Sequence, residues 1–160
     1  MTFLVRDAAI SDRDILLALN NSAVPHVNRL DVEQFAWLAE HADYLRVADD
    51  NGRVSGFVLA LRAGLGYWSL NYRWFSRRHD DFLYLDRVVV AEDTRRRGVG
   101  RLLYGDIIAF AADKWPRIAL EVNLRPPNPG SIAFHEKLGF RHVGVREEEE
   151  GRKAVAMMER

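Results

Sequence analysis

A glycine-containing turn between a predicted strand and a predicted helix is the first segment that could carry chemistry. Residues 95–100 read Arg-Arg-Arg-Gly-Val-Gly, after an apolar run at residues 88–90 and before helical spacing that begins near Val99. Glycines let a ligand approach backbone N–H groups, and a helix N-terminus carries roughly half a positive charge. The turn therefore predicts a pyrophosphate or polyphosphate site, with a plain helix-capping turn as the alternative.

The spacing around this turn excludes two common phosphate sites. A Walker A loop continues Gly-Lys-Ser/Thr, whereas Gly100 is followed by Arg101 and Leu102. A dinucleotide fingerprint needs a third Gly or Ala three positions after its second glycine, where this chain has Leu103.

Two carboxylates interrupt apolar stretches that read as strands. Asp86 lies in Leu-Tyr-Leu-Asp-Arg-Val-Val-Val, and Glu121 lies in Ile-Ala-Leu-Glu-Val. Acids inside strands are uncommon, so each is a candidate to accept a proton in a reaction. The alternative for each is an ion pair with a neighbouring arginine or an exposed position at a strand end.

Composition limits the possible functions. The chain has 160 residues, 48% of them hydrophobic and 29% charged, as expected for one globular domain spanning residues 1–160. Its 23 Lys and Arg balance 23 Asp and Glu, which argues against a nucleic-acid partner. Without cysteine there is no disulfide, thiolate-bound metal or Cys nucleophile.

Histidine spacing and targeting signals narrow the possibilities further. His26, His41, His79 and His142 lack metal-ligand spacing, so no metal is expected. The chain shows no signal peptide and no apolar run long enough for a membrane span, so we expect a cytoplasmic protein without a membrane partner.

The elements that must position these residues alternate between strands and helices. Ser11 and Asp31 read as N-caps of two helices, and Asn51-Gly52 reads as a hairpin turn. The other predicted elements are strands at residues 3–6, 82–90 and 118–122, helices at 99–114 and 131–138, and a terminal hairpin that begins at Phe140 and turns near Gly151. Residues 88–122 form a β–α–β unit with parallel strands, so the sequence predicts an α/β fold with a mixed, twisted sheet.

Two motifs together resemble the GCN5-related N-acetyltransferase (GNAT) family. The family turn Arg/Gln-x-x-Gly-x-Gly/Ala matches residues 95–100. A second pattern, Asn-x-x-Ala/Ser-x-x-Phe/Leu-Tyr-x-x-x-Gly-Phe, matches Asn128, Ser131, Phe134, Gly139 and Phe140 in register. The resemblance is close over residues 82–143.

The resemblance implies a GNAT-like single domain in which two strands splay to form a cleft for acetyl-CoA. It implies that the turn holds the pyrophosphate and that the strand before it pairs with the pantetheine arm. The residues expected to bind acetyl-CoA are Val88, Val89, Val90, Arg95, Arg96, Arg97, Gly98, Val99, Gly100, Arg101, Asn123, Asn128, Ser131 and Phe134.

The resemblance also implies an activity, the transfer of an acetyl group to a primary amine by direct attack in a ternary complex. Some relatives carry their general base at the position of Glu121, which is our first choice, and others carry it near Asp86. The usual tyrosine acid is replaced by His135, which we expect either to donate a proton with a raised pKa or only to hydrogen-bond the sulfur, with a surface histidine as the alternative. Because of this replacement, a CoA-binding module without turnover is the alternative function.

Residues 62–81, the longest stretch without an assigned element, give an expectation about the chemical class of the acetyl acceptor. It carries five large aromatics with interleaved arginines, which fits a lid over the acceptor, or else an amphipathic helix or dimer contact. A basic, aromatic lid would favour a small-molecule amine or a peptide N-terminus that bears a negative or aromatic group. Terminal strands often pair across a dimer in this family, so a homodimer is compatible with the resemblance.

Overall fold

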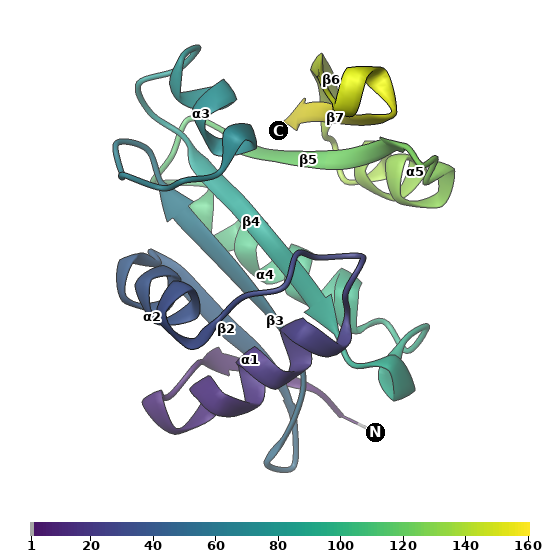
Figure 1. Cartoon of the computed structure of the whole chain (residues 1–160). Coiled ribbons are helices and arrows are strands. Elements are labelled where there is room, and N and C mark those ends of the chain that lie inside the picture. Colours follow the sequence, from purple (N-terminus) through teal and green to yellow (C-terminus); the bar gives the residue numbers. More distant parts are fainter. Residues whose placement is uncertain (1) are drawn as a thin grey trace. The chain divides into compact units, whose positions relative to one another are not determined.

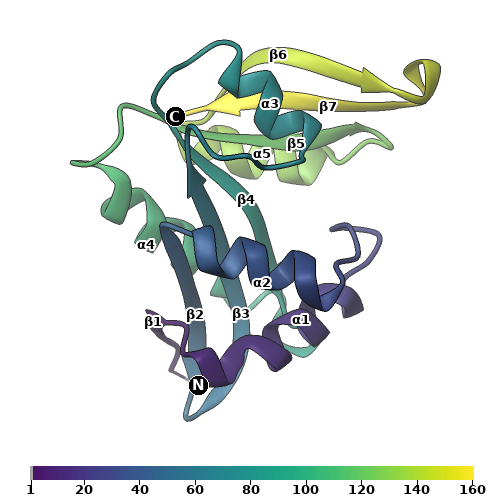
Figure 2. The same cartoon turned by 60° about the vertical axis from the view of Figure 1, so that its left-hand side comes forward.

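The computed structural model describes residues 2–160, which form two compact units (Figures 1 and 2). The first comprises the residues up to Leu61 together with Leu85–Ala112, and the second comprises Arg62–Tyr84 and Asp113–Arg160. Seven strands run in the order β1-β2-β3-β4-β5-β7-β6. Strand β4 (Leu83–Val90) contributes residues to both units.

The first unit contains β1 (Leu4–Asp7), β2 (Tyr44–Asp50), most of β3 (Arg53–Arg62) and the larger part of β4. β1 pairs antiparallel with β2, and β2 pairs antiparallel with β3. The hairpin turn at Asn51 and Gly52 is as predicted, and both residues have positive φ, which Asn and Gly tolerate best.

Helices cover both faces of the strands in this unit (Figure 2). α1 (Arg13–Ser22) and α2 (Val32–His41) lie on one face, and α4 (Val99–Ala111) lies on the other. Asp31 caps α2 as predicted, since its side chain accepts from the Gln34 N–H at 2.7 Å while Gln34 bonds back to the Asp31 N–H. Gly56 of β3 faces Val99 and Leu103 of α4, so the helix packs where the strand has no side chain.

The second unit contains the start of β4, together with β5 (Ile118–Arg125), β6 (Arg141–Glu148) and β7 (Lys153–Glu159). β4 pairs in parallel with β5 at Leu83 and Tyr84, as the β–α–β pattern predicts. β5 and β6 each pair antiparallel with β7. The predicted α/β class with a mixed sheet flanked by helices is therefore confirmed.

Two helices contact β5 in this unit, α3 (Leu70–Ser76) and α5 (Pro129–Lys137). Figure 2 shows α3 in front of the strands and α5 behind them. The N-cap of α3 is Ser69, whose hydroxyl accepts from the Tyr72 N–H at 3.2 Å, and the N-cap of α5 is Asn128.

Three of the five large aromatic residues in residues 62–81 pack in the interior of their unit. Tyr67, Tyr72 and Phe75 are buried, and their rings meet those of Phe82 and Tyr84 edge-on or tilted. The Tyr72 hydroxyl donates to the Arg62 carbonyl at 2.6 Å and accepts from the Leu65 N–H at 3.0 Å. These three residues therefore belong to the core of their unit, and α3 is a helix as the amphipathic-helix alternative predicts, whereas Trp68 is 38% exposed. A lid over the acceptor and a preference for an anionic or aromatic acceptor stay predictions.

Within residues 2–160, none of the helices combines the length and apolar character needed to cross a lipid bilayer.

Candidate active site

The glycine turn lies at the start of α4, in the first unit. Gly98 is the N-cap residue and adopts a left-handed conformation with φ of 83°. A side chain at this φ would cost about 1–2 kcal/mol. A short 3-10 turn, Glu92–Thr94, precedes it, and Thr94 anchors this turn by donating its hydroxyl to the Ala91 carbonyl at 3.0 Å. The left-handed backbone at position 98 therefore accounts for the glycine there.

The turn also fits an anionic ligand. Gly98 has no side chain to cap α4, so the first N–H groups of the helix are left for a ligand or water. A Cβ atom built on Gly98 or Gly100 meets no atom within 4 Å, so the space above the turn is open. Four arginines flank it with exposed side chains: Arg95, Arg96, Arg97 and Arg101. Helix dipole, backbone donors and cations together suit a pyrophosphate.

At its C-terminal end, β4 is hydrogen-bonded along one edge to β3. The N–H of Ala91 donates to the Ser55 carbonyl at 2.8 Å, and the Val89 carbonyl faces Gly56. Because backbone groups alternate along a strand, those of Val88 and Val90 point to the opposite edge. The resemblance expects the pantetheine arm there.

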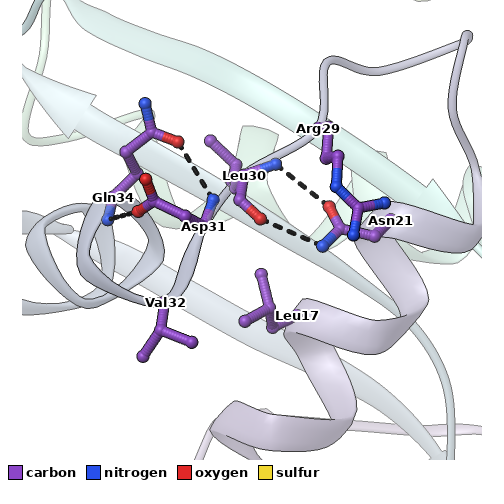
Figure 3. Close-up of a pocket in the computed structure, with 7 residues that line it drawn as sticks. All are labelled: Leu17, Asn21, Arg29, Leu30, Asp31, Val32 and Gln34. Atoms are coloured by element: carbon purple, nitrogen blue, oxygen red, sulfur yellow. Dashed lines mark hydrogen bonds between the residues drawn. The ribbon is translucent and has the colours of Figure 1, made fainter.

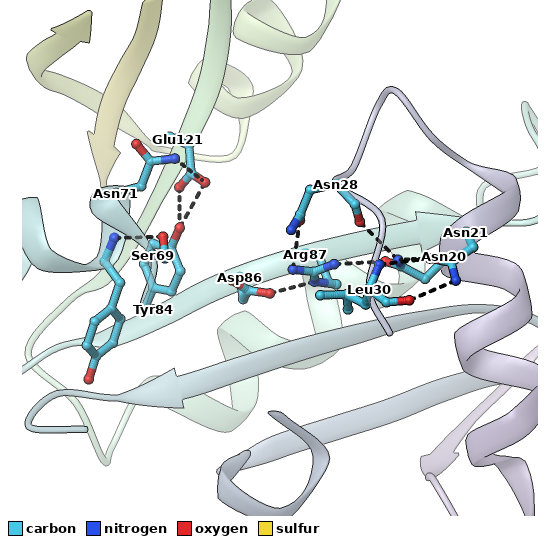
Figure 4. Close-up of polar contacts among 11 residues, drawn as sticks. Asn20, Asn21, Asn28, Leu30, Ser69, Asn71, Tyr84, Asp86, Arg87 and Glu121 are labelled. Carbon is cyan, nitrogen blue, oxygen red and sulfur yellow. Dashed lines mark hydrogen bonds and ion pairs between the residues drawn. The ribbon is translucent and has the colours of Figure 1, made fainter. Parts of the chain in front are cut away.

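Glu121 lies on β5 within a polar cluster of the second unit (Figure 4). The Tyr84 hydroxyl lies 2.8 and 2.7 Å from the two carboxylate oxygens, and the Asn71 amide nitrogen lies 3.0 Å from Oε1. Both donors are neutral. Tyr84 is 1% exposed, so its hydroxyl needs a polar partner and finds one in Glu121.

Asp86 lies on β4 in the first unit and has a cationic partner (Figure 4). Its carboxylate accepts from Arg87 Nε at 2.5 Å, and the two side chains are only 4% and 3% exposed. Arg87 also donates to the side-chain oxygens of Asn20 at 2.9 Å and Asn28 at 3.1 Å. The ion-pair alternative stated for Asp86 is what the structure contains.

The second motif builds α5 and its N-terminus. Asn128 accepts from the Ser131 N–H at 3.3 Å, and this is an N-cap bond that the motif spacing provides. Phe134 meets the ring of His135 edge-on, and Asn123 is exposed on β5 opposite Val155 of β7. Contact of Asn123, Asn128, Ser131 and Phe134 with acetyl-CoA stays a prediction.

His135 is buried, 6% exposed, so the surface-histidine alternative is wrong. Its Nδ1 lies 2.7 Å from the Ser131 carbonyl, which only accepts, so Nδ1 carries the proton and Nε2 of the neutral ring is an acceptor. Desolvation lowers the pKa of His135 below its usual 6.5, while the bond to Ser131 acts in the opposite direction. The expected acid with a raised pKa is therefore wrong, and hydrogen bonding to the sulfur stays a prediction.

Sequence reasoning missed the partners of Glu121. Tyr84 carried a usable signal, because a buried tyrosine hydroxyl seeks a polar partner. Asn71 carried none, because its helix was not assigned from the sequence.

A pocket of about 480 Å³ lies in the first unit, at α1 and α2 (Figure 3). Its lining residues are Leu17, Asn21, Arg29, Leu30, Asp31, Val32 and Gln34. The Asn21 side chain spans the loop between the helices, donating to the Leu30 carbonyl and accepting from its N–H, both at 3.0 Å. Among the described lining residues none is one that the sequence predicted for the site.

Comparison with known proteins identifies similar chains. An N-alpha-acetyltransferase of Sulfolobus acidocaldarius is 27% identical over 145 residues, covering 89% of this chain and 82% of the relative. The ribosomal-protein-alanine N-acetyltransferase of Brucella melitensis has a similar structure, with 25% identity, a TM-score of 0.74 and 98% of each chain covered.

The structure of Arabidopsis thaliana NAA60 in complex with acetyl-CoA is also similar, with 20% identity, a TM-score of 0.76 and 99% of each chain covered. The family model described as the acetyltransferase (GNAT) family matches residues 14–140. Because this match spans well over half of the chain, the protein belongs to the GNAT family of acetyltransferases.

Proposed function

We propose that this enzyme transfers the acetyl group of acetyl-CoA to the α-amino group of a protein or peptide N-terminus. The observation that carries the proposal is the Glu121 cluster, in which a strand carboxylate is held by two neutral donors. The Sulfolobus relative is an N-alpha-acetyltransferase and the Brucella neighbour acts on a ribosomal protein alanine, which supports the same acceptor class.

The two strand carboxylates differ in what they can do for an attacking amine. Asp86 already forms a buried ion pair with Arg87, so its negative charge is balanced within the protein. The two donors described for Glu121, the Tyr84 hydroxyl and the Asn71 amide, carry no charge, so neither of them neutralises the carboxylate. We therefore assign the base to Glu121, which accepts the proton directly or through water.

The chemistry requires few protein groups. The neutral amine forms a C–N bond to the thioester carbonyl carbon, the C–S bond breaks, and the amine proton passes to Glu121. The pKa of a CoA thiol is similar to that of cysteine, about 8.5, so the thiolate is a tolerable leaving group. The CoA thiolate then takes a proton from solvent, because Nε2 of the neutral His135 ring carries no proton to donate. In this proposal His135 at most accepts a hydrogen bond from the thiol.

A peptide terminus suits this arrangement better than a lysine. An α-amine with a pKa near 7.8 costs about 1 kcal/mol to deprotonate at pH 7, whereas a lysine amine with a pKa near 10.4 costs about 4.6 kcal/mol. One carboxylate base is sufficient for the smaller cost.

We further infer that the two compact units together make one acetyltransferase domain. Two observations support this inference. β4 contributes residues to both units, and the family match at residues 14–140 includes parts of both.

The test is an acetylation assay with two peptides of matched sequence. One has a free α-amine and no lysine, and the other has a blocked N-terminus and one lysine. Thiol release and the peptide mass are both measured with acetyl-CoA. We expect turnover of the free-terminus peptide only.

Two outcomes would contradict the proposal. Preference for the lysine peptide or for a polyamine would change the acceptor class. Tight CoA binding by calorimetry without turnover on any amine would favour the CoA-binding module instead.

A further inference from the structure

Asn71 of α3 joins Glu121 to an arginine. Its amide nitrogen donates to Glu121 Oε1 at 3.0 Å, and its side-chain oxygen accepts from Arg146 Nε at 2.6 Å. Arg146 lies on β6, so residues 71, 121 and 146 come from three elements of the second unit that are distant in sequence.

The chemistry of Arg146 fixes which end of the Asn71 amide faces Glu121. A guanidinium has only donors and stays protonated, so it can bond only the oxygen of the amide. The NH₂ group is therefore turned to Glu121. This orientation follows from the arginine, whatever the assignment of the amide atoms.

The orientation decides which form of Glu121 is stabilised. With the NH₂ group and the Tyr84 hydroxyl both donating, the carboxylate form is favoured. A reversed amide would put an oxygen against the carboxylate and would favour the protonated acid, which cannot take a proton from an amine.

The surroundings hold Asn71 and Arg146 in place. One turn after Asn71, Trp74 lies directly over Gly144 of β6, where a Cβ atom would overlap the indole ring. Arg78 stacks on the same ring, with its guanidinium carbon 3.3 Å from the ring centroid. Glu148 pairs with Arg146 through Nη2, which leaves Nε for Asn71, and the Arg146 side chain is only 16% exposed.

We propose that Arg146 and Asn71 are positioning residues of this reaction, which together keep Glu121 as a proton-accepting carboxylate. The inference rests on the proposed function, because that function gives Glu121 its role. The titratable groups of the cluster are Tyr84 on β4, Arg146 and Glu148 on β6, and Glu121 itself, and the β7 residue paired with Glu121 is the uncharged Met157.

The experiment compares Arg146→Met with Arg146→Lys in the peptide assay. Lysine also has only donors, so it preserves the direction of the amide, whereas methionine does not. We expect Arg146→Met to lower kcat about tenfold, the effect of losing a hydrogen bond to a charged group. The acidic limb of the pH–rate profile should move to higher pH, with CoA affinity unchanged, and Arg146→Lys should recover most of both changes.

The matched control is Arg125→Met. Arg125 lies on β5 and pairs with Glu147 of β6 at 3.2 Å, so the control also removes an arginine that pairs with a β6 glutamate in this unit. We expect it to leave kcat and the pH profile unchanged. An Arg146→Met enzyme that folds, by thermal unfolding, and keeps the normal profile would overturn the proposal, as would equal losses in Arg146→Met and Arg146→Lys.

A second readout separates this proposal from the proposed function. The Glu121 carboxyl carbon is titrated by NMR in the unmodified enzyme and in Arg146→Met, and we expect its midpoint to rise in the variant. Equal midpoints would overturn the positioning role even if the enzyme acetylates peptides. A raised midpoint in an enzyme that acetylates no peptide would support the positioning role and reject the function.

Discussion

The glycine turn at residues 95–100 and the Glu121 cluster belong to different compact units and use different atoms. The turn offers backbone N–H groups at the start of α4, and its left-handed conformation at Gly98 favours a residue without a side chain. The cluster uses a hydroxyl, an amide and a guanidinium, and each must come from a particular residue. We therefore expect the two regions to control different quantities. Substitutions in the turn should change the affinity for CoA, and substitutions in the cluster should change kcat.

The largest effect is expected at Glu121. Glu121→Gln removes the base and should lower kcat at pH 7 by about 100-fold or more, with CoA affinity by calorimetry unchanged. The deficit should shrink toward pH 9.5, because solvent then deprotonates the amine. Glu147→Gln, a change of an exposed acid on β6, is the matched control. A greater loss in Asp86→Asn than in Glu121→Gln would move the base to Asp86.

The buried ion pair on β4 should matter for stability instead. Arg87→Met leaves the Asp86 carboxylate buried without its cation and should lower the free energy of unfolding by about 3–5 kcal/mol. Urea unfolding measures this change. Arg13→Met removes a half-buried arginine that lies 4.0 Å from the exposed Glu40 and should cost less than about 1 kcal/mol. Similar losses in both variants would mean that the Asp86–Arg87 pair is not the stabilising element we describe.

Gly98→Asp tests the other side of the comparison. The left-handed conformation at Gly98 and the added negative charge should together weaken CoA binding about tenfold to 100-fold, with kcat at saturating acetyl-CoA retained. Gly105→Asp adds the same carboxylate to the same helix at an exposed position with open space and should leave affinity unchanged. Calorimetry with CoA distinguishes them, and a loss of kcat in Gly98→Asp without a loss of affinity would contradict the separation.

The smallest expected effect is that of His135 on the stability of the protein at acidic pH. The pKa of His135 is lowered in the folded state. Below the unfolded value of about 6.5 the unfolded chain therefore binds more protons than the folded chain, and the free energy of unfolding decreases as the pH is lowered. Above that value the contribution is constant. His135→Gln should therefore have a flatter stability profile between pH 7 and pH 5 by urea unfolding. Parallel profiles in the two proteins would show that His135 does not titrate with unfolding.

Local signals in the sequence were enough to predict most of the fold. Asp31 is an N-cap, Asn51 and Gly52 turn a hairpin, and the glycines at 98 and 100 mark the start of α4. Each signal acts over three or four residues. The predicted cap at Ser11 is wrong, because Ser11 lies inside the short 3-10 turn Ile10–Asp12 and Asp12 precedes α1. α3 was not assigned from the sequence, because its aromatic residues fit a lid, an amphipathic helix or a dimer contact until the rest of the core is known.

The candidate site divides in the same way. The turn and the Asn128 motif could be predicted because their geometry is set by consecutive residues. Glu121 and Asp86 were visible as acids inside apolar strands, but their partners were not equally visible. Arg87 is adjacent in sequence to Asp86. Asn71 is remote in sequence from Glu121, and Arg146 is remote from Asn71, so tertiary packing brings these three residues together.

Gly144 has a consequence for sequence variation among relatives. Since any side chain at position 144 would occupy the space of the Trp74 ring, the two positions cannot vary independently. A homologue with a larger residue at 144 must carry a smaller one at 74 or shift the helix that bears Asn71. The pair Gly144 and Trp74 is therefore a sequence marker for relatives in which an asparagine at 71 is within reach of the strand carboxylate.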